Sequence, residues 1–244
     1  MTDHTVTLTQ AERTRTTVNL RPKDAATMLI LDRNGARPKV LMGKRHPGHK
    51  FMPGKYVFPG GRLDAGDRRM AATGALPQIC EDRLGKRVLR PSPGKARALA
   101  LAAIRETFEE TGLLFGSAEF GQPENPPEGT WRDFAAQGVF PDLSAVNFVA
   151  RAITPPRRPK RFDTRFFTID ASSLAGKVEG VTGPDSELTD LAWVDFDEAR
   201  ELDLPTITKV IIQEVEARIA AGFAPYLPVP FYWEQRGRFV REEL

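Results

Sequence analysis

Three glutamates, Glu106, Glu109 and Glu110, lie close together in the segment IRETFEETG, residues 104–112. On a helix the positions i, i+3 and i+4 are neighbours, and like charges at this spacing repel each other by a few tenths of a kcal/mol. An acidic helix face in solvent is the more common explanation of such a pattern. The alternative is a site for a divalent metal, because Mg²⁺ prefers oxygen ligands.

The segment before this helix favours the metal site. It contains a glycine-rich stretch, FPGGRLDAGD, at residues 58–67. Glycines allow backbone carbonyls to turn inward, and Asp64 and Asp67 add two carboxylates. A loop carbonyl and the helix glutamates would together form an all-oxygen ligand set that needs neither His nor Cys.

Composition limits the other possibilities. The chain has 244 residues and a net charge of only +3, which suits one sizeable domain and does not favour nucleic acid as a partner. The single Cys80 excludes an internal disulfide framework or a cysteine zinc site. No apolar run approaches the roughly 20 residues that cross a bilayer, and the polar N-terminal residues do not resemble a signal peptide. We therefore expect a cytoplasmic protein with no membrane partner.

The pattern along the chain predicts one domain at residues 25–222, after a polar extension at 1–24 and before a C-terminal tail at 223–244. Strands are expected at 25–32 and 39–45, joined by an Asn-Gly turn, and a third strand ends at Pro59. Later strands are expected at 164–171 and 191–196. Together with the helices described next, these strands predict a mixed α/β sandwich.

Two helices stand out. One runs from Lys95 to a glycine stop at Gly112, and an amphipathic helix occupies 205–222. Between the glycine-rich loop and the first helix, residues 68–94 have no clear apolar period and contain PSPG. We interpret them as an insertion that leaves the sheet, with one short helix at most. We expect a shorter link in its place to leave a folded domain.

The loop and helix resemble the signature of the Nudix hydrolase family. That signature is Gly, five residues, Glu, seven residues, and then Arg-Glu-apolar-any-Glu-Glu-any-Gly-apolar. The chain has Gly61, Asp67 in the first Glu position, and RETFEETGL at residues 105–113, with Thr107 at a usually apolar position. Residues 68–104 stand where the family has seven. FMPGKYVFPGGRLDAGD, AIRETFEETGLL and RFDTRFF resemble the coenzyme A diphosphatase branch of the family.

This resemblance implies an α/β/α sandwich with a mixed β-sheet, one catalytic loop-helix-loop and a long insertion in the Nudix signature. It implies a site for Mg²⁺ or Mn²⁺, in which Arg105 orients a glutamate. The implied ligands are Glu106, Glu109, Glu110 and the carbonyl of Gly60, with help from Asp67. One of the glutamates, or Glu187 in a later loop, would take a proton from the attacking water; an ordinary loop glutamate at 187 remains the alternative.

Positive charge is concentrated in two segments. No acidic residue lies between Asp32 and Asp64, a span with eight Lys and Arg residues, and a second basic run lies at residues 157–165. A solvated basic surface is the alternative to a phosphate site. Cations in a fixed geometry suit a ligand with more than one phosphate group. The predicted substrate-binding residues are Lys44, Arg45, Arg62, Arg161 and Arg165.

The function expected from the resemblance is hydrolysis of a pyrophosphate bond in a nucleoside diphosphate-linked substrate. Coenzyme A or acyl-coenzyme A is favoured, giving 3′,5′-ADP and 4′-phosphopantetheine or its acyl form. ADP-ribose, NADH and dinucleoside polyphosphates are alternative substrates, and a non-catalytic Nudix-fold regulator that binds a nucleotide is an alternative of another class. The expected partner is a small-molecule nucleotide, with no nucleic acid, and a homodimer remains open.

Overall fold

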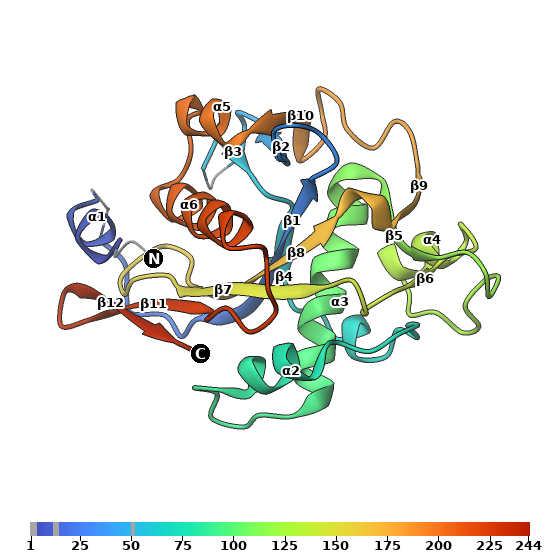
Figure 1. The fold of residues 1–244 in the computed structure, drawn as a ribbon, viewed down its shortest axis with the longest axis horizontal. Coiled ribbons are helices and arrows are strands. Elements are labelled where there is room, and N and C mark those ends of the chain that lie inside the picture. Colours follow the sequence, from blue (N-terminus) through green and yellow to red (C-terminus); the bar gives the residue numbers. More distant parts are fainter. Residues whose placement is uncertain (1–3, 12–14, 50–51) are drawn as a thin grey trace.

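A mixed sheet forms the centre of the structure, a computed structural model that describes residues 4–11, 15–49 and 52–244. The described residues form a nine-stranded main sheet in the order β10-β2-β1-β8-β7-β11-β12, with β3 paired to β2 and β4 to β1 (Figure 1). The strands are β1 Lys23–Asp32, β2 Lys39–Arg45, β3 Tyr56–Val57, β4 Gly60–Arg62, β7 Asn147–Ile153, β8 Phe162–Asp170, β10 Leu188–Asp195, β11 Pro230–Gln235 and β12 Arg238–Glu243. The pairs β1–β8 and β7–β11 are parallel.

Two long helices cover the two faces of this sheet. Helix α3, Pro93–Thr111, lies on one side and α6, Thr206–Ala220, on the other (Figure 1). Side chains of β1 alternate between the faces. Met28 and Ile30 belong to the core cluster that contains α3, whereas Leu29 belongs to the cluster that contains α6. The predicted α/β/α sandwich with a mixed sheet is confirmed.

Smaller elements complete the domain. A three-stranded sheet is formed by β5, β6 and β9, and the short helices lie around the edges. Their bounds are β5 Leu113–Ser117, β6 Phe140–Pro141, β9 Leu174–Lys177, α1 Thr5–Gln10, α2 Gln78–Gly85, α4 Thr130–Ala135, α5 Phe196–Glu201, and 3₁₀ turns at Gly66–Arg68 and Ala171–Ser173.

Local chemistry fixes both ends of α3. The Ser92 hydroxyl accepts a hydrogen bond from the Lys95 backbone N–H at 3.2 Å, so the helix is capped at its start. Gly112 ends it with a φ of +74°, and a Cβ there would come within 2.1 Å of the Val178 carbonyl oxygen. The sequence predicts this helix to within two residues because both signals are local.

The glycine-rich segment differs from the predicted loop. Gly60–Arg62 forms β4, which pairs antiparallel with β1, with Gly61 opposite Ala26. A Cβ on Gly60 would lie 2.6 Å from the Ala26 carbonyl oxygen. The two glycines therefore allow β4 to lie tightly against β1 and to bring the following residues next to α3.

The insertion at 68–94 leaves the sheet but is not an appendage. Its side chains Met70, Leu76, Cys80 and Leu84 are buried in the core cluster on the α3 side. Arg97 of α3 also donates to the Met70 carbonyl at 2.6 Å. Because a short link would expose this part of the core, the expectation that the shortened chain stays folded loses its basis.

The expected C-terminal tail, 223–244, is part of the domain. Its strands β11 and β12 form a hairpin that extends the main sheet next to β7, and Tyr232 is fully buried. The turn uses Arg236 and Gly237, both at positive φ (50° and 82°), a conformation that suits two-residue hairpin turns. The domain thus extends to Leu244 rather than ending at residue 222.

Candidate active site

Arg105 joins the glycine-rich segment to α3. Its side chain is buried, and its Nε donates to Asp67 Oδ1 at 2.7 Å. Its two terminal nitrogens reach the Arg62 carbonyl at 2.8 Å and Glu106 Oε1 at 2.9 Å. Charge-assisted hydrogen bonds of this kind fix geometry as well as adding stability. The predicted role of Arg105 in orienting a glutamate agrees with these contacts.

Asp67 does not line the cleft that contains Glu106 and Glu110. The side chain is completely buried. Besides Arg105, it accepts hydrogen bonds from Trp131 Nε1 at 2.8 Å and from the Asp64 backbone N–H at 2.7 Å. These contacts occupy both carboxylate oxygens, so the structure places Asp67 as an anchor for Arg105 and not as the metal ligand suggested by the resemblance.

Glu106 and Glu110 line a cleft of about 420 Å³ between β4 and α6. Glu110 accepts a hydrogen bond from the Gly60 backbone N–H at 3.0 Å. The carboxyl group of Glu106 lies so close to Gly61 that a Cβ there would come within 2.4 Å of it. The glycine pair is therefore needed twice, once for the pairing of β4 and once for the approach of the carboxylates.

Negative charge in the cleft is poorly compensated. Burial raises the pKa of Glu106 to about 7, and Glu109 adds to the rise although Arg105 opposes it. Burial also raises the pKa of Glu110 well above its usual range, with further contributions from the charges of Glu187 and Glu106. A cation placed among these carboxylates would relieve both the desolvation and the repulsion.

Metal ligation itself stays a prediction. Among the described residues, no group of three or more acidic, His or Cys side chains is arranged to hold a metal ion. Glu109 is half exposed and accepts hydrogen bonds from Thr130 and Arg105, away from the cleft lining. The chemistry of buried Glu110 and partly buried Glu106, two neighbouring carboxylates whose pKa values are raised, fits a hard divalent cation. The Gly60 carbonyl also stays a predicted ligand.

Glu187 faces the same cleft from the loop before β10. Its carboxylate pairs with Arg45 at 2.9 Å, and both residues line the cleft. Arg45 is largely buried, and within the described part of the chain its Nε has no hydrogen-bond partner. Arg45 therefore lies beside the Glu187 carboxylate, with donor capacity left for a ligand.

The other predicted substrate-binding residues separate into two groups. Arg62 lines the cleft, whereas the Lys44 ammonium lies 5.9 Å from the centre of the Tyr56 ring and outside the lining. Arg161 donates to the Thr154 and Leu20 carbonyls and to Asn19, so it holds loops together.

Arg165 is 1% exposed and is paired with Asp24 and Asp163. This buried position does not support the expected contact with a substrate. Lys160 belongs to the same basic run and was not among the predicted substrate-binding residues, yet it lines the cleft. Lys50, also in the first basic span, lies outside the described residues.

No helix in the described part of the chain has the length and apolar character needed to cross a membrane.

Comparison with known proteins identifies relatives for the chain, although no family model matches it. Human acyl-coenzyme A diphosphatase NUDT19 is 29% identical, over 53% of this chain and 47% of that protein. Putative nudix hydrolase 7 of Caenorhabditis elegans is 27% identical, over 71% of this chain and 51% of that protein. The chain thus spans about half the length of the curated relatives it matches.

A solved structure extends the comparison to the whole fold. The NUDIX hydrolase from Alicyclobacillus acidocaldarius is 28% identical, with a TM-score of 0.60, over 83% of this chain and 96% of that one. In sequence and fold the chain therefore resembles the Nudix hydrolases, and among them the coenzyme A diphosphatase branch.

Proposed function

We propose that this protein is a metal-dependent pyrophosphohydrolase that cleaves coenzyme A or acyl-coenzyme A into 3′,5′-ADP and 4′-phosphopantetheine or its acyl form. The observation that carries the proposal is the pair of buried Glu110 and partly buried Glu106, which lines one cleft with Glu187, Arg45 and Arg62. The human and chicken relatives bear the name acyl-coenzyme A diphosphatase, which supports this choice of substrate.

Each residue has a role in this proposal. When bound, Mg²⁺ or Mn²⁺ would neutralise charge on the pyrophosphate oxygens and lower the pKa of a water molecule bound to it. Glu106 and Glu110 hold the ion, and Arg105 keeps Glu106 in position through their 2.9 Å contact. Glu187, at the cleft, accepts a proton from the attacking water. Arg45 and Arg62 bind phosphate oxygens, since guanidinium groups suit phosphate in a fixed geometry.

A regulator that binds a nucleotide without cleaving it is the second candidate. One observation favours it: Glu109 is held by Thr130 and Arg105 away from the cleft, so the three helix glutamates do not converge. A cytoplasmic location and a homodimer stay predictions from the sequence.

A substrate panel tests the proposal. Coenzyme A, acyl-coenzyme A, ADP-ribose, NADH and a dinucleoside tetraphosphate are each incubated with the protein and Mg²⁺ or Mn²⁺, with a chelator as the control. Mass spectrometry identifies the products. We expect 3′,5′-ADP from coenzyme A at the highest kcat/KM. Faster cleavage of ADP-ribose selects the alternative substrate, and nucleotide binding without any product under either metal selects the regulator.

A further inference from the structure

A second cavity, of about 380 Å³, adjoins the cleft. Six residues line both spaces, among them Met52, Phe166 and Ile207, so one wall is common to the two. A ligand whose phosphates lie among the carboxylates can therefore extend along this shared wall into the second cavity.

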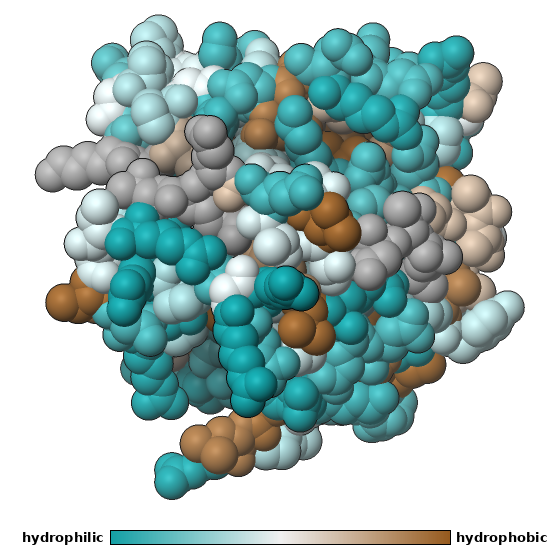
Figure 2. Space-filling model, turned by 90° about the vertical axis from the view of Figure 1, so that its left-hand side faces the viewer, coloured by the Kyte–Doolittle hydropathy of each residue, from teal (hydrophilic) through white to brown (hydrophobic). Residues whose placement is uncertain are grey.

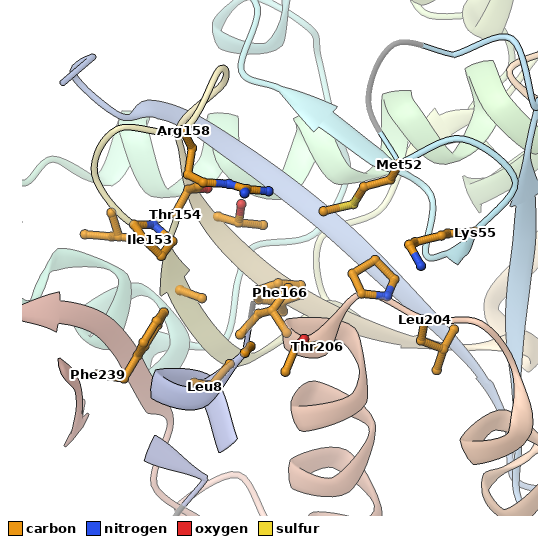
Figure 3. Close-up of a pocket in the computed structure, with 16 residues that line it drawn as sticks. Leu8, Met52, Lys55, Ile153, Thr154, Arg158, Phe166, Leu204, Thr206 and Phe239 are labelled. Atoms are coloured by element: carbon orange, nitrogen blue, oxygen red, sulfur yellow. The ribbon is translucent and has the colours of Figure 1, made fainter. Parts of the chain in front are cut away.

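The walls of the second cavity are mainly hydrocarbon, and they come from distant parts of the chain. Figure 3 shows Leu8 and Phe239 on one side and Phe166 near the centre, while Met52 and Arg158 extend toward each other across the opposite side. Leu8 belongs to α1 and Phe239 to β12, and Phe239 is also tied to α1 through its backbone N–H, which donates to the Thr9 hydroxyl at 2.9 Å. The two ends of the domain thus close this cavity.

Charge separates the two spaces. The cleft contains the acidic residues Glu106, Glu110 and Glu187 together with Arg45, Arg62 and Lys160. Among the described residues, the only ionisable side chains that line the second cavity are Lys55 and Arg158, so that cavity has no acidic group. A purine base needs partners for its ring nitrogens, and hydrocarbon walls offer few. The lining suits a long and weakly polar chain instead, with cations at its edge where a phosphate would begin.

The outer surface argues against a protein as the occupant. The face that carries α1 and the β11–β12 hairpin is mostly hydrophilic, and hydrophobic residues appear there only in small separate patches (Figure 2). A protein partner would be expected to use a broader apolar patch. The apolar surface lies inside the cavity, where a flexible ligand arm fits.

We propose that the second cavity binds a long, largely apolar arm carried on the second phosphate of a nucleoside diphosphate, an alkyl or acyl-pantetheine chain. This inference rests on the proposed function only for the position of the pyrophosphate. Affinity for the arm grows with its length because each buried methylene group contributes up to about a fourfold gain. Preference among linked nucleoside diphosphates is then decided outside the carboxylate cleft.

Two substrates separate the arm from the nucleotide. ADP-ribose and 3′-dephospho-coenzyme A share ADP and differ only in the group on the second phosphate. Ala11→Phe fills the cavity from the end of α1, and Thr206→Phe fills it from the start of α6. Val6→Phe is the matched control, since Val6 lies on α1 but is 61% exposed and outside the lining.

We expect both filling variants to lower kcat/KM for 3′-dephospho-coenzyme A at least tenfold and for its decanoyl thioester further, while ADP-ribose changes less than twofold. Val6→Phe leaves all three values unchanged. An equal loss on ADP-ribose and on 3′-dephospho-coenzyme A in both filling variants overturns the proposal. Thermal unfolding of each variant confirms that the proteins compared are folded.

A binding measurement keeps this test independent of catalysis. S-decanoyl-pantetheine lacks the pyrophosphate, and calorimetry measures its binding to the full chain. We expect wild type and Val6→Phe to bind it and both filling variants to bind at least tenfold more weakly. No binding to wild type overturns the cavity proposal. Normal binding without cleavage of any pyrophosphate supports the cavity and overturns the proposed function instead.

Discussion

The carboxylate cleft and the apolar cavity share a wall, yet they are built in different ways. In the cleft, β4 and α3 supply Arg62, Glu106 and Glu110, and Arg105 ties these two elements together through hydrogen bonds to the Arg62 carbonyl and to Glu106. The other charged groups of the cleft lining, Arg45, Lys160 and Glu187, come from β2 and two loops. The cavity joins α1, β7, β8, α6 and β12, which packing brings together. If both proposals hold, the reacting groups depend on the Arg105-centred motif, and the choice of arm depends on packing between distant parts of the chain.

The largest effect is expected from Glu110→Gln. If Glu110 holds the metal, kcat should fall roughly a thousandfold on every substrate, because several kcal/mol of charge stabilisation are lost. Stability without metal should not fall, since a buried and repelled carboxylate is removed. Steady-state kinetics on ADP-ribose and 3′-dephospho-coenzyme A measure this, with exposed Glu124→Gln as the control. A loss of kcat that differs between ADP-ribose and 3′-dephospho-coenzyme A would show that the carboxylate cleft and the apolar cavity are coupled.

Asp67→Asn should act through Arg105. The change removes the carboxylate partner of a buried guanidinium, and breaking such a pair costs about 3–5 kcal/mol. We expect that loss in the free energy of unfolding from urea titration, together with a lower kcat on all substrates at nearly unchanged KM. Exposed Asp133→Asn should change neither quantity. An unchanged stability would mean that Arg105 finds another partner and that the cleft is not anchored as described.

The difference in pH-dependent stability between wild type and Glu106→Gln reports on the cleft. Burial raises the pKa of Glu106 to about 7 in the folded protein from its ordinary value of 4.5, so the folded state binds this proton more tightly than the unfolded state. Stability of the metal-free protein should therefore fall as pH rises from about 4.5 to 7, by on the order of 1–3 kcal/mol relative to Glu106→Gln.

Urea titrations across this pH range, with and without Mg²⁺, measure the difference between the two proteins. Mg²⁺ should reduce the fall of the wild-type curve between pH 4.5 and 7, because a bound cation favours the ionised carboxylate and lowers its pKa in the folded state. Parallel curves of stability against pH for wild type and Glu106→Gln would show that folding does not raise the pKa of Glu106.

The smallest effect concerns the additional phosphate of coenzyme A. Arg45→Ala should lower the ratio of kcat/KM for coenzyme A to that for 3′-dephospho-coenzyme A about fivefold, since charged hydrogen bonds contribute about 1.5–3 kcal/mol and part is recovered from solvent. Lys44→Ala is the matched control, because Lys44 is adjacent in β2 but outside the cleft lining. A ratio of one in wild type would contradict a site for the 3′-phosphate.

The sequence predicted those parts of the fold whose signals are local. The β1–β2 pair, α3 with its Gly112 stop and α6 are recognisable from period, turn and cap residues. The β11–β12 hairpin was missed because its turn, Arg236–Gly237, is not among the strongest turn signals and its strands are short. The insertion was misjudged because its core residues are spaced irregularly and acquire meaning only against α3.

The site shows the same limit. The helix motif identified Glu106, Glu110 and Arg105, which the structure brings to one place. It could not show that Glu109 turns to Thr130, or that Arg165 is buried between Asp24 and Asp163, because these contacts join residues from different elements. The apolar cavity has no sequence motif, because the residues that line it have the pattern of ordinary core residues in the sequence.

The contact between Arg105 and Asp67 has a consequence for how such a chain can change. The ends of the insertion are held together through space by that ion pair, so the site does not depend on how much chain lies between them. Lengthening a flexible link from seven residues to the length of 68–104 costs only about 1.5 kcal/mol of closure entropy. Added chain at this point can accordingly pack against α3, as the insertion does here, while the reacting groups keep their places.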